Sequence, residues 1–128
     1  NNTDCINCSN DLDWKFIATV KKSVEDNMDN PSFNVDVLCN LLNMSRTSFY
    51  NKIKALTDQA PADYIRLIRL KHAAQLLKEQ KHTITEISEL TGFSDAKYFR
   101  EVFKKHFNMS PSQYAKRGKE GKDDEEIK

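Results

Sequence analysis

Basic and aromatic residues alternate in a regular way across the segment 92–111. Phe99, Phe103 and Phe107 recur at every fourth residue, so they share one side of a predicted helix. The other side carries the charged residues Lys97, Arg100, Glu101, Lys104 and Lys105. Ammonium and guanidinium groups suit phosphate oxygens, so the pattern favours binding of a polyanion. The alternative is an ordinary surface helix with a solvated charged face.

A tight turn precedes this helix. Gly92 suits the left-handed backbone of a turn between two short helices. We expect Ser94 to supply the N-cap oxygen for a helix that begins near Asp95. A short helix that follows a glycine turn, apolar on one side and basic on the other, is typical of a helix-turn-helix that meets DNA.

The same arrangement is predicted at residues 34–57. Asn34 caps a short helix, Asn43 makes the turn because it tolerates left-handed backbone, and Ser45 caps the next helix. The predicted inner positions of the pair are Val35, Leu38, Leu41, Leu42, Phe49, Ile53 and Leu56. The predicted outer face of the second helix holds Arg46, Thr47, Tyr50, Asn51 and Lys54.

The two segments form an internal repeat. Leu38, Leu41 and Ser45 match Ile87, Leu90 and Ser94 at an offset of 49 residues. Generic helical packing, as in tetratricopeptide-like arrays, also repeats helix pairs, but such arrays need more copies of equal length. Here a single helix, predicted at 62–79 with Pro61 in its first turn, separates the copies. It is apolar on most of its circumference, which indicates packing against both units.

The sequence contains no pattern that predicts a catalytic site or a metal site. The three histidines are scattered, no carboxylate pair converges, and no glycine-rich phosphate loop is present, so we expect no enzyme. Cys5 and Cys8 have the spacing of half a zinc site, but no second Cys/His pair follows, so we expect an exposed, silent pair. Cys39 fits a small core residue. No metal and no cofactor are predicted.

Charge is distributed unevenly along the 128 residues. The formal net charge is only +1, yet residues 45–117 carry +7 between two acidic flanks. A basic middle is expected where one face meets a polyanion. No stretch has the roughly 20 apolar residues that cross a bilayer, so we expect a cytoplasmic protein without a membrane partner.

The remaining signals complete an all-α prediction of about seven helices, because no segment alternates with the period of a strand. The first helix is predicted at 13–28, capped by Asp11 or Asp13. Capping boxes are predicted at Thr83–Glu86 and Ser110–Gln113. The expected organisation is a disordered leader (1–10), a DNA-binding domain (11–117) with helix-turn-helix pairs at 34–57 and 83–107, and a disordered charged tail (118–128).

On these residues the sequence resembles the AraC/XylS family of bacterial transcription regulators. The likeness spans roughly residues 32–116. It is carried by Ile68-Arg69-Leu70, Ala73-Ala74, Leu76-Leu77, Ile84-Thr85-Glu86-Ile87, Gly92-Phe93-Ser94-Asp95, Tyr98-Phe99, Val102-Phe103-Lys104, Met109-Ser110-Pro111 and Tyr114. It implies two helix-turn-helix subdomains, joined by a long helix, in successive major-groove segments of double-stranded DNA.

The helix at 13–28 and the run Asp29–Phe33 further resemble the output domains of Bacteroides-type hybrid two-component regulators. That likeness implies receiver or sensor domains upstream, and RNA polymerase is a further expected partner. Two residues depart from the family pattern: Asn108 stands where a glycine is usual, and Glu101 stands where a basic residue is common.

Residue roles follow from side-chain chemistry. Arg46 suits guanine, Asn51 suits adenine, and Tyr50 can pack on a thymine methyl group. The predicted base readers are Arg46, Thr47, Tyr50 and Asn51 in the first groove and Ala96, Lys97, Arg100 and Glu101 in the second. The predicted phosphate contacts are Ser45, Lys52, Lys54, Ser94, Lys104 and Lys105.

The expected function is sequence-specific binding of double-stranded DNA by part of a larger, signal-responsive regulator. We expect most of the specificity from residues 46–54, because Ala96 and Glu101 weaken the second helix as a reader. The alternative is a helical protein-interaction module whose basic faces dock an acidic partner.

Overall fold

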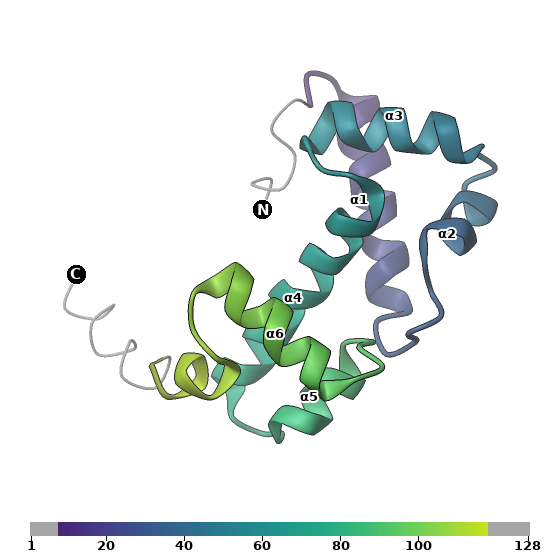
Figure 1. Ribbon diagram of the computed structural model, residues 1–128. Helices are drawn as coiled ribbons and strands as arrows, with labels where there is room; N and C mark the ends of the chain where they lie inside the picture. Colours follow the sequence, from purple (N-terminus) through teal and green to yellow (C-terminus); the bar gives the residue numbers. More distant parts are fainter. Residues whose placement is uncertain (1–7, 118–128) are drawn as a thin grey trace. The chain divides into compact units, whose positions relative to one another are not determined.

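Every regular element in the described part of the chain is a helix. The structure is a computed structural model that describes residues 8–117 (Figure 1). The helices are α1 (Asp11–Asp26), α2 (Val35–Leu41), α3 (Arg46–Thr57), α4 (Pro61–Glu79), α5 (Ile84–Leu90) and α6 (Ala96–Phe107), followed by a helical segment at 111–117. Within this range the all-α prediction of about seven helices without strands is confirmed.

The described residues divide into two compact units, and α4 contributes to both. The first unit contains the described residues up to Met28 together with Ser32–Arg69, and the second contains Asp29–Pro31 and the described residues from Leu70 on. The first half of α4 therefore belongs to one core and its second half to the other. This division explains why the sequence of α4 is apolar on most of its circumference.

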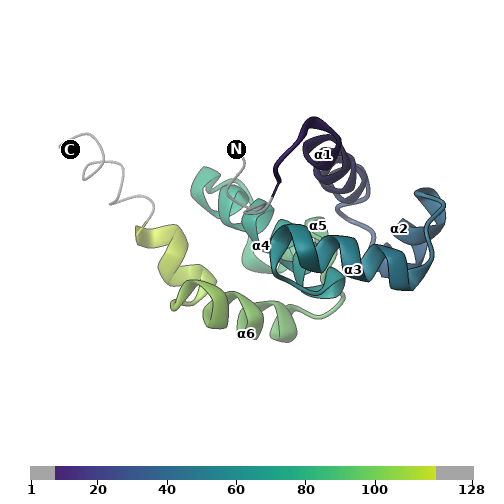
Figure 2. The ribbon, with the colours of Figure 1, turned by 90° about the horizontal axis from the view of Figure 1, so that it is seen from above.

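The core of the first unit is built from α1, α2, α3 and the start of α4. Its buried members are Ile17, Val20, Val24, Met28, Phe33, Leu38, Cys39, Phe49, Ile53, Leu56, Tyr64, Ile65 and Ile68. Within this unit α2 and α3 follow each other across a short turn (Figure 2). The predicted role of Cys39 as a core residue is confirmed, since only 3% of it is exposed.

Arg69 connects α4 to the segment between α1 and α2 inside the first unit. It is only 5% exposed, and its Nη1 and Nη2 donate to the carbonyl oxygens of Met28 at 2.6 Å and Phe33 at 3.1 Å. Burial lowers the pKa of the guanidinium because desolvation disfavours the charged form. Met28 and Phe33 lie outside the helices, between α1 and α2, so their carbonyls accept no hydrogen bonds of a helix ladder. The two bonds from Arg69 satisfy these carbonyls instead.

The core of the second unit is dominated by a chain of aromatic rings. Ring centroids lie 5.1 Å apart for Phe93 and Phe99, 5.7 Å for Phe99 and Phe103, and 4.4 Å for Phe103 and Phe107. Tyr114, in the helical segment 111–117, packs edge-on against Phe103 at 5.4 Å. Offset and edge-to-face rings of this kind add to the burial energy of the core.

Most predicted caps and turns are confirmed. Asn34 and Ser45 cap α2 and α3, and Thr83 with Glu86 forms a reciprocal capping box at α5. Ser110 and Gln113 exchange the same pair of hydrogen bonds. The left-handed positions include Asn43, Gly92 and Asn108, with φ of 54°, 80° and 62°. Asn108 therefore adopts the backbone for which glycine is usual.

The predicted start of the first helix is wrong. Asn10, not Asp11 or Asp13, is the N-cap, because its side-chain oxygen accepts from the Asp13 N–H at 2.9 Å. Asp11 and Asp13 instead lie in the first turn, where a negative charge favours the helix dipole. The helix consequently runs from Asp11 to Asp26, two residues ahead of the predicted range at both ends.

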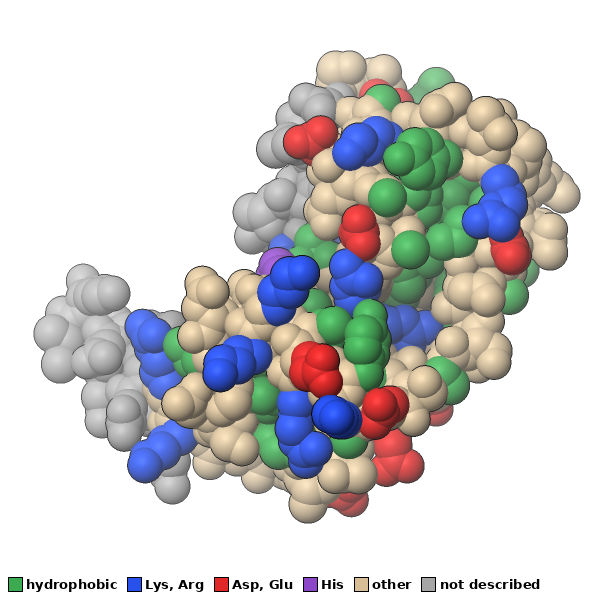
Figure 3. Space-filling model, viewed as in Figure 1, with side chains coloured by type: hydrophobic (Ala, Val, Ile, Leu, Met, Phe, Trp, Pro, Cys, Tyr) green, Lys and Arg blue, Asp and Glu red, His purple; other side chains and the backbone are tan. Residues whose placement is uncertain are grey.

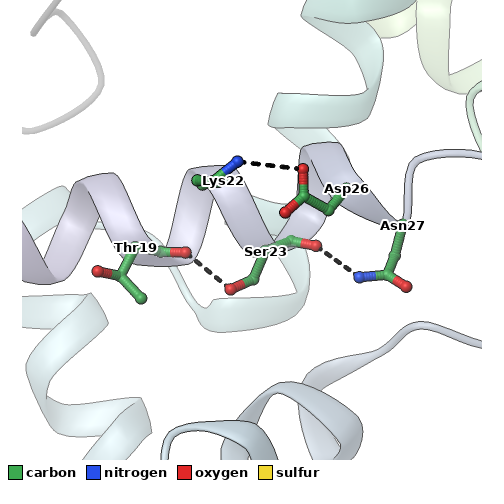
Figure 4. Close-up of polar contacts among 5 residues, drawn as sticks. All are labelled: Thr19, Lys22, Ser23, Asp26 and Asn27. Carbon is green, nitrogen blue, oxygen red and sulfur yellow. Dashed lines mark hydrogen bonds and ion pairs between the residues drawn. The ribbon is translucent and has the colours of Figure 1, made fainter.

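The outer side of α1 is held by local hydrogen bonds (Figure 4). Ser23 donates to the Thr19 carbonyl, Asn27 donates to the Ser23 carbonyl, and Lys22 pairs with Asp26 at 3.4 Å. These polar groups find their partners within α1 and its C-cap residue Asn27. The opposite side of α1 packs against the core.

Two predicted inner positions are exposed. Leu41 is 60% exposed and Leu90 is 39% exposed, although both matched an apolar pattern. In each short helix the residue two positions earlier, Cys39 or Ser88, is buried in its place. Ser88 was overlooked because it is polar, and its hydroxyl is satisfied by the Thr85 carbonyl at 2.8 Å.

Some predictions fall on the ends of the chain. Cys5, most of the predicted leader 1–10 and the tail 118–128 lie outside the described residues. Cys8 is half-buried and packs against the first core, which contradicts its predicted exposure.

Candidate nucleic-acid interface

The outer face of α3 gathers the predicted base readers of the first unit. Because α3 turns Phe49, Ile53 and Leu56 into the core, residues 46, 47, 50, 51 and 54 share the opposite side. All five are exposed. A groove of about 390 Å³ runs beside them and is lined by Val35, Arg46, Thr47, Tyr50, Asn51, Ala60, Pro61 and Ala62. The structure thus places the four predicted base readers along a groove whose other lining residues are apolar.

Arg46 is tied to the neighbouring helix. Its Nη1 lies 3.2 Å from the Asp36 carboxylate in the first turn of α2, with 74% and 61% of the two side chains exposed. An ion pair this exposed contributes less than about 1 kcal/mol to stability. Sequence reasoning did not single out Asp36, because the contact depends on the angle at which the turn sets α2 against α3.

The structure separates Lys52 from the other candidates. Its Nζ lies 4.7 Å from the centre of the Phe16 ring of α1, and the residue is half-buried. On α3 this position is nearly opposite the face that carries Arg46, Tyr50 and Lys54. Its ammonium therefore faces α1 and not the outer face of the helix.

The outer face of α6 gathers the candidates of the second unit. Lys97, Arg100, Glu101, Lys104 and Lys105 are exposed, and Ala96 is half-buried. The second unit shows several lysine and arginine side chains with a few acidic ones among them (Figure 3). Phe99 and Phe103 lie completely buried on the other side of the helix. The face is basic, as predicted, with Glu101 as its acidic exception.

The predicted cap of α6 is wrong. Asp95, not Ser94, is the N-cap, and its carboxylate accepts from the Lys97 N–H at 3.0 Å. Asp95 is a better cap than Ser94 because the negative charge of its carboxylate also interacts favourably with the positive end of the helix dipole. The Asp95 carboxylate also repels an anion, whereas the hydroxyl of Ser45 that caps α3 is neutral, so the start of α6 is less suited to a phosphate than the start of α3.

This change of cap also corrects the repeat. The offset is 49 residues for α2 and α5, but 50 for α3 and α6, because the second turn is one residue longer. Asp58 and Asn108, which end α3 and α6 in the left-handed conformation, share the offset of 50. The matched outer positions are Arg46 with Ala96, Thr47 with Lys97, Tyr50 with Arg100, Asn51 with Glu101, and Lys54 with Lys104. The pairing of Pro61 with Pro111 in the sequence was the signal that could have revealed it.

Two other kinds of feature, a metal site and a membrane-spanning helix, are absent from the described residues. Within 8–117 no group of three His, Cys, Asp or Glu side chains is arranged to hold a metal ion. In the same range no helix is both long and apolar enough to span a bilayer.

Comparison with known proteins gives the family. A family model described as a helix-turn-helix domain matches residues 38–117. A relative named histidine kinase P4, from Formosa agariphila, is 46% identical over 106 residues, which are 83% of this chain but only 8% of that protein. The chain therefore spans a small part of the length of this relative.

Two solved structures have a fold similar to that of this chain. The DNA-binding domain of AdpA, crystallised with a target DNA, has a TM-score of 0.72 at 25% identity and covers 79% of this chain and 90% of that one. A Chromobacterium violaceum regulator with an AraC-type DNA-binding domain has a TM-score of 0.76 and covers 85% and 96%; at 23% identity it shows the fold. Because the family model matches more than half of the chain, the chain belongs to this AraC-type family of helix-turn-helix domains.

Proposed function

We propose that the chain binds double-stranded DNA sequence-specifically through the outer faces of α3 and α6. The observation that carries this proposal is the repeated pair of helices in which the second helix exposes four matched positions in both units: 47 and 97, 50 and 100, 51 and 101, and 54 and 104. A helix that is buried on one side and exposes basic and hydrogen-bonding groups on the other suits a major groove.

We assign base reading in the first unit to Arg46, Thr47, Tyr50 and Asn51. Arg46 offers two donors that suit the O6 and N7 acceptors of guanine, Asn51 offers a donor and an acceptor that suit adenine, and the ring of Tyr50 can meet a thymine methyl group. Lys54, on the same face, would contact phosphate, as would the backbone at Ser45, where the amides of α3 begin. Lys52 is left out of the interface because of its contact with Phe16.

We assign a weaker reading role to α6. Lys97 and Arg100 are its basic readers, Glu101 can accept from cytosine N4, and Ala96 offers only a small apolar contact. Lys104 and Lys105 would hold phosphates. Ser94, an exposed residue of the turn, would also contact phosphate, although Asp95 is the N-cap of α6. Specificity should therefore depend more on α3.

We also propose that the chain is the DNA-binding part of a larger bacterial regulator. The relative named as a histidine kinase supports this, since this chain corresponds to only 8% of it. Sensor or receiver domains of the same protein would then control DNA binding, and RNA polymerase would be met at the promoter. Action on bacterial DNA places the chain in the cytoplasm.

The test begins with selection of bound duplexes from a randomised pool. Arg46→Ala and Asn51→Ala should each lose about 1–3 kcal/mol of binding free energy on the selected duplex and little on random DNA. Lys22→Ala is the control, because Lys22 is an exposed lysine of α1 paired with Asp26. Affinity should also fall steeply as salt is raised.

Two results would contradict the proposal. Equal losses on selected and random DNA would show that Arg46 and Asn51 hold phosphate and do not read bases. A chain that enriches no duplex at low salt would refute DNA binding and favour the protein-interaction module.

A further inference from the structure

We propose that Asp36 is a positioning residue for DNA reading: it holds Arg46 toward the bases and away from the phosphates. The inference rests on the proposed DNA-binding function and deepens it. Asp36 lies in α2, which is not the reading helix, yet its carboxylate is 3.2 Å from Nη1 of Arg46. The pair thus links the two helices of the first helix-turn-helix.

Stability does not account for this pair. Both side chains are mostly exposed, and exposed ion pairs of this kind contribute little to folding. Arg46 is also the first residue of α3, where the positive end of the helix dipole disfavours a cation. Asp36 offsets that repulsion, so its carboxylate determines where the guanidinium lies.

The position of the pair connects it to recognition. Arg46 lines the groove of about 390 Å³ together with Thr47, Tyr50 and Asn51. A guanidinium has five N–H donors on three nitrogens, so Nη1 can remain on Asp36 while Nε and Nη2 meet guanine O6 and N7. Without the carboxylate, Arg46 is released to the nearest phosphate, which carries no sequence information.

The second unit lacks this device. The residue equivalent to Asp36 is Thr85, at the offset of 49, and the residue equivalent to Arg46 is Ala96, at the offset of 50. Neither can form an ion pair. The orientation of a reading arginine by a carboxylate is therefore confined to the unit to which we assign most of the specificity.

A matched control exists within the first unit. Lys22 and Asp26 of α1 form an ion pair at 3.4 Å with exposed fractions of 77% and 60%, close to the 74% and 61% of Arg46 and Asp36 (Figure 4). Asp26→Asn removes the same charge from an equally exposed pair. It lies on α1, away from the outer face of α3. Any general effect of net charge on DNA affinity will appear in both variants.

The experiment measures selectivity, the ratio of the Kd for random duplex to the Kd for a duplex selected with the wild-type chain. Asp36→Asn should reduce this ratio by about threefold to tenfold, mainly through tighter binding to random DNA. Asp26→Asn should leave the ratio within about twofold, as should adding Asp36→Asn to Arg46→Ala, because Asp36 acts through Arg46. Both single variants should keep the wild-type urea midpoint, since all the altered groups are exposed.

Three outcomes would overturn the inference. If Asp36→Asn and Asp26→Asn change selectivity equally, Asp36 has no special role, while the proposed DNA binding stands. If Asp36→Asn still lowers selectivity in the Arg46→Ala background, Asp36 does not act through Arg46. If the wild-type chain shows no preference for any selected duplex, the inference fails together with the proposed function.

Discussion

Replacing Arg69 by methionine should destabilise the first unit strongly. Methionine keeps the length and the apolar stem of the side chain but removes the donors to the Met28 and Phe33 carbonyls. Hydrogen bonds to a charged group contribute about 1.5–3 kcal/mol each, and buried carbonyls that lose a partner add a desolvation cost. Burial of the charged guanidinium is unfavourable, which is why the pKa of Arg69 is lowered. Methionine carries no charge, so the substitution removes this cost and offsets part of the loss. We expect a net loss of about 3 kcal/mol.

The assay is urea unfolding followed by tryptophan fluorescence. Trp14 is the only tryptophan in the chain and packs against the first core, so its emission reports on the first unit. For a small domain the free energy of unfolding falls by about 1–3 kcal/mol per molar urea, so the midpoint should drop by about 1–3 M. Arg69→Lys should fall between wild type and Arg69→Met, because one ammonium cannot reproduce the fork that spans two carbonyls.

Arg66→Met, on the same helix, is the matched control. Arg66 pairs with Asp63 at 2.7 Å, and 39% of its side chain is exposed. Loss of such a pair should cost less than about 1 kcal/mol. Equal midpoints for Arg66→Met and Arg69→Met would refute the argument that buried carbonyls make Arg69 important.

Two further predictions concern the second unit. The Glu86 carboxylate accepts the Thr83 N–H at 2.8 Å, which holds its pKa below the ordinary value of 4.5. Wild type should therefore be more stable than Glu86→Gln above pH 4.5, and this advantage should vanish as pH falls through the lowered pKa; urea melts across pH 3–7 that show a constant difference would contradict it. Phe103→Ala should cost about 3–5 kcal/mol, because Phe103 is fully buried among three rings. Circular dichroism would measure this loss, and a loss below about 1 kcal/mol would show that the ring cluster collapses around the gap.

Local signals in the sequence determined much of the fold. Asn34, Ser45 and Thr83 were recognisable as caps because their side chains satisfy amides only three residues away. Gly92 and Asn43 were recognisable as left-handed positions for an equally local reason. The periodic phenylalanines of α6 indicated which side is buried, and therefore which side is basic and exposed.

The sequence did not determine which of several neighbouring residues caps a helix. Asn10 and Asp95 displaced the predicted caps, since several adjacent residues could each supply an oxygen and the backbone geometry selects one. Leu41 and Leu90 matched an apolar pattern but are exposed, because a helix of seven residues presents too few positions to define its buried side. The longer second turn then moved the repeat by one residue.

The sequence by itself thus determined the helices, the repeat and the chemistry of the two outer faces, because these depend on residues within one or two turns of each other. Only the tertiary structure placed Asp36 beside Arg46, Lys52 over Phe16, and Arg69 against two carbonyls at least 36 residues away in the chain. Such contacts depend on the angles between packed helices. No local pattern of residues encodes those angles.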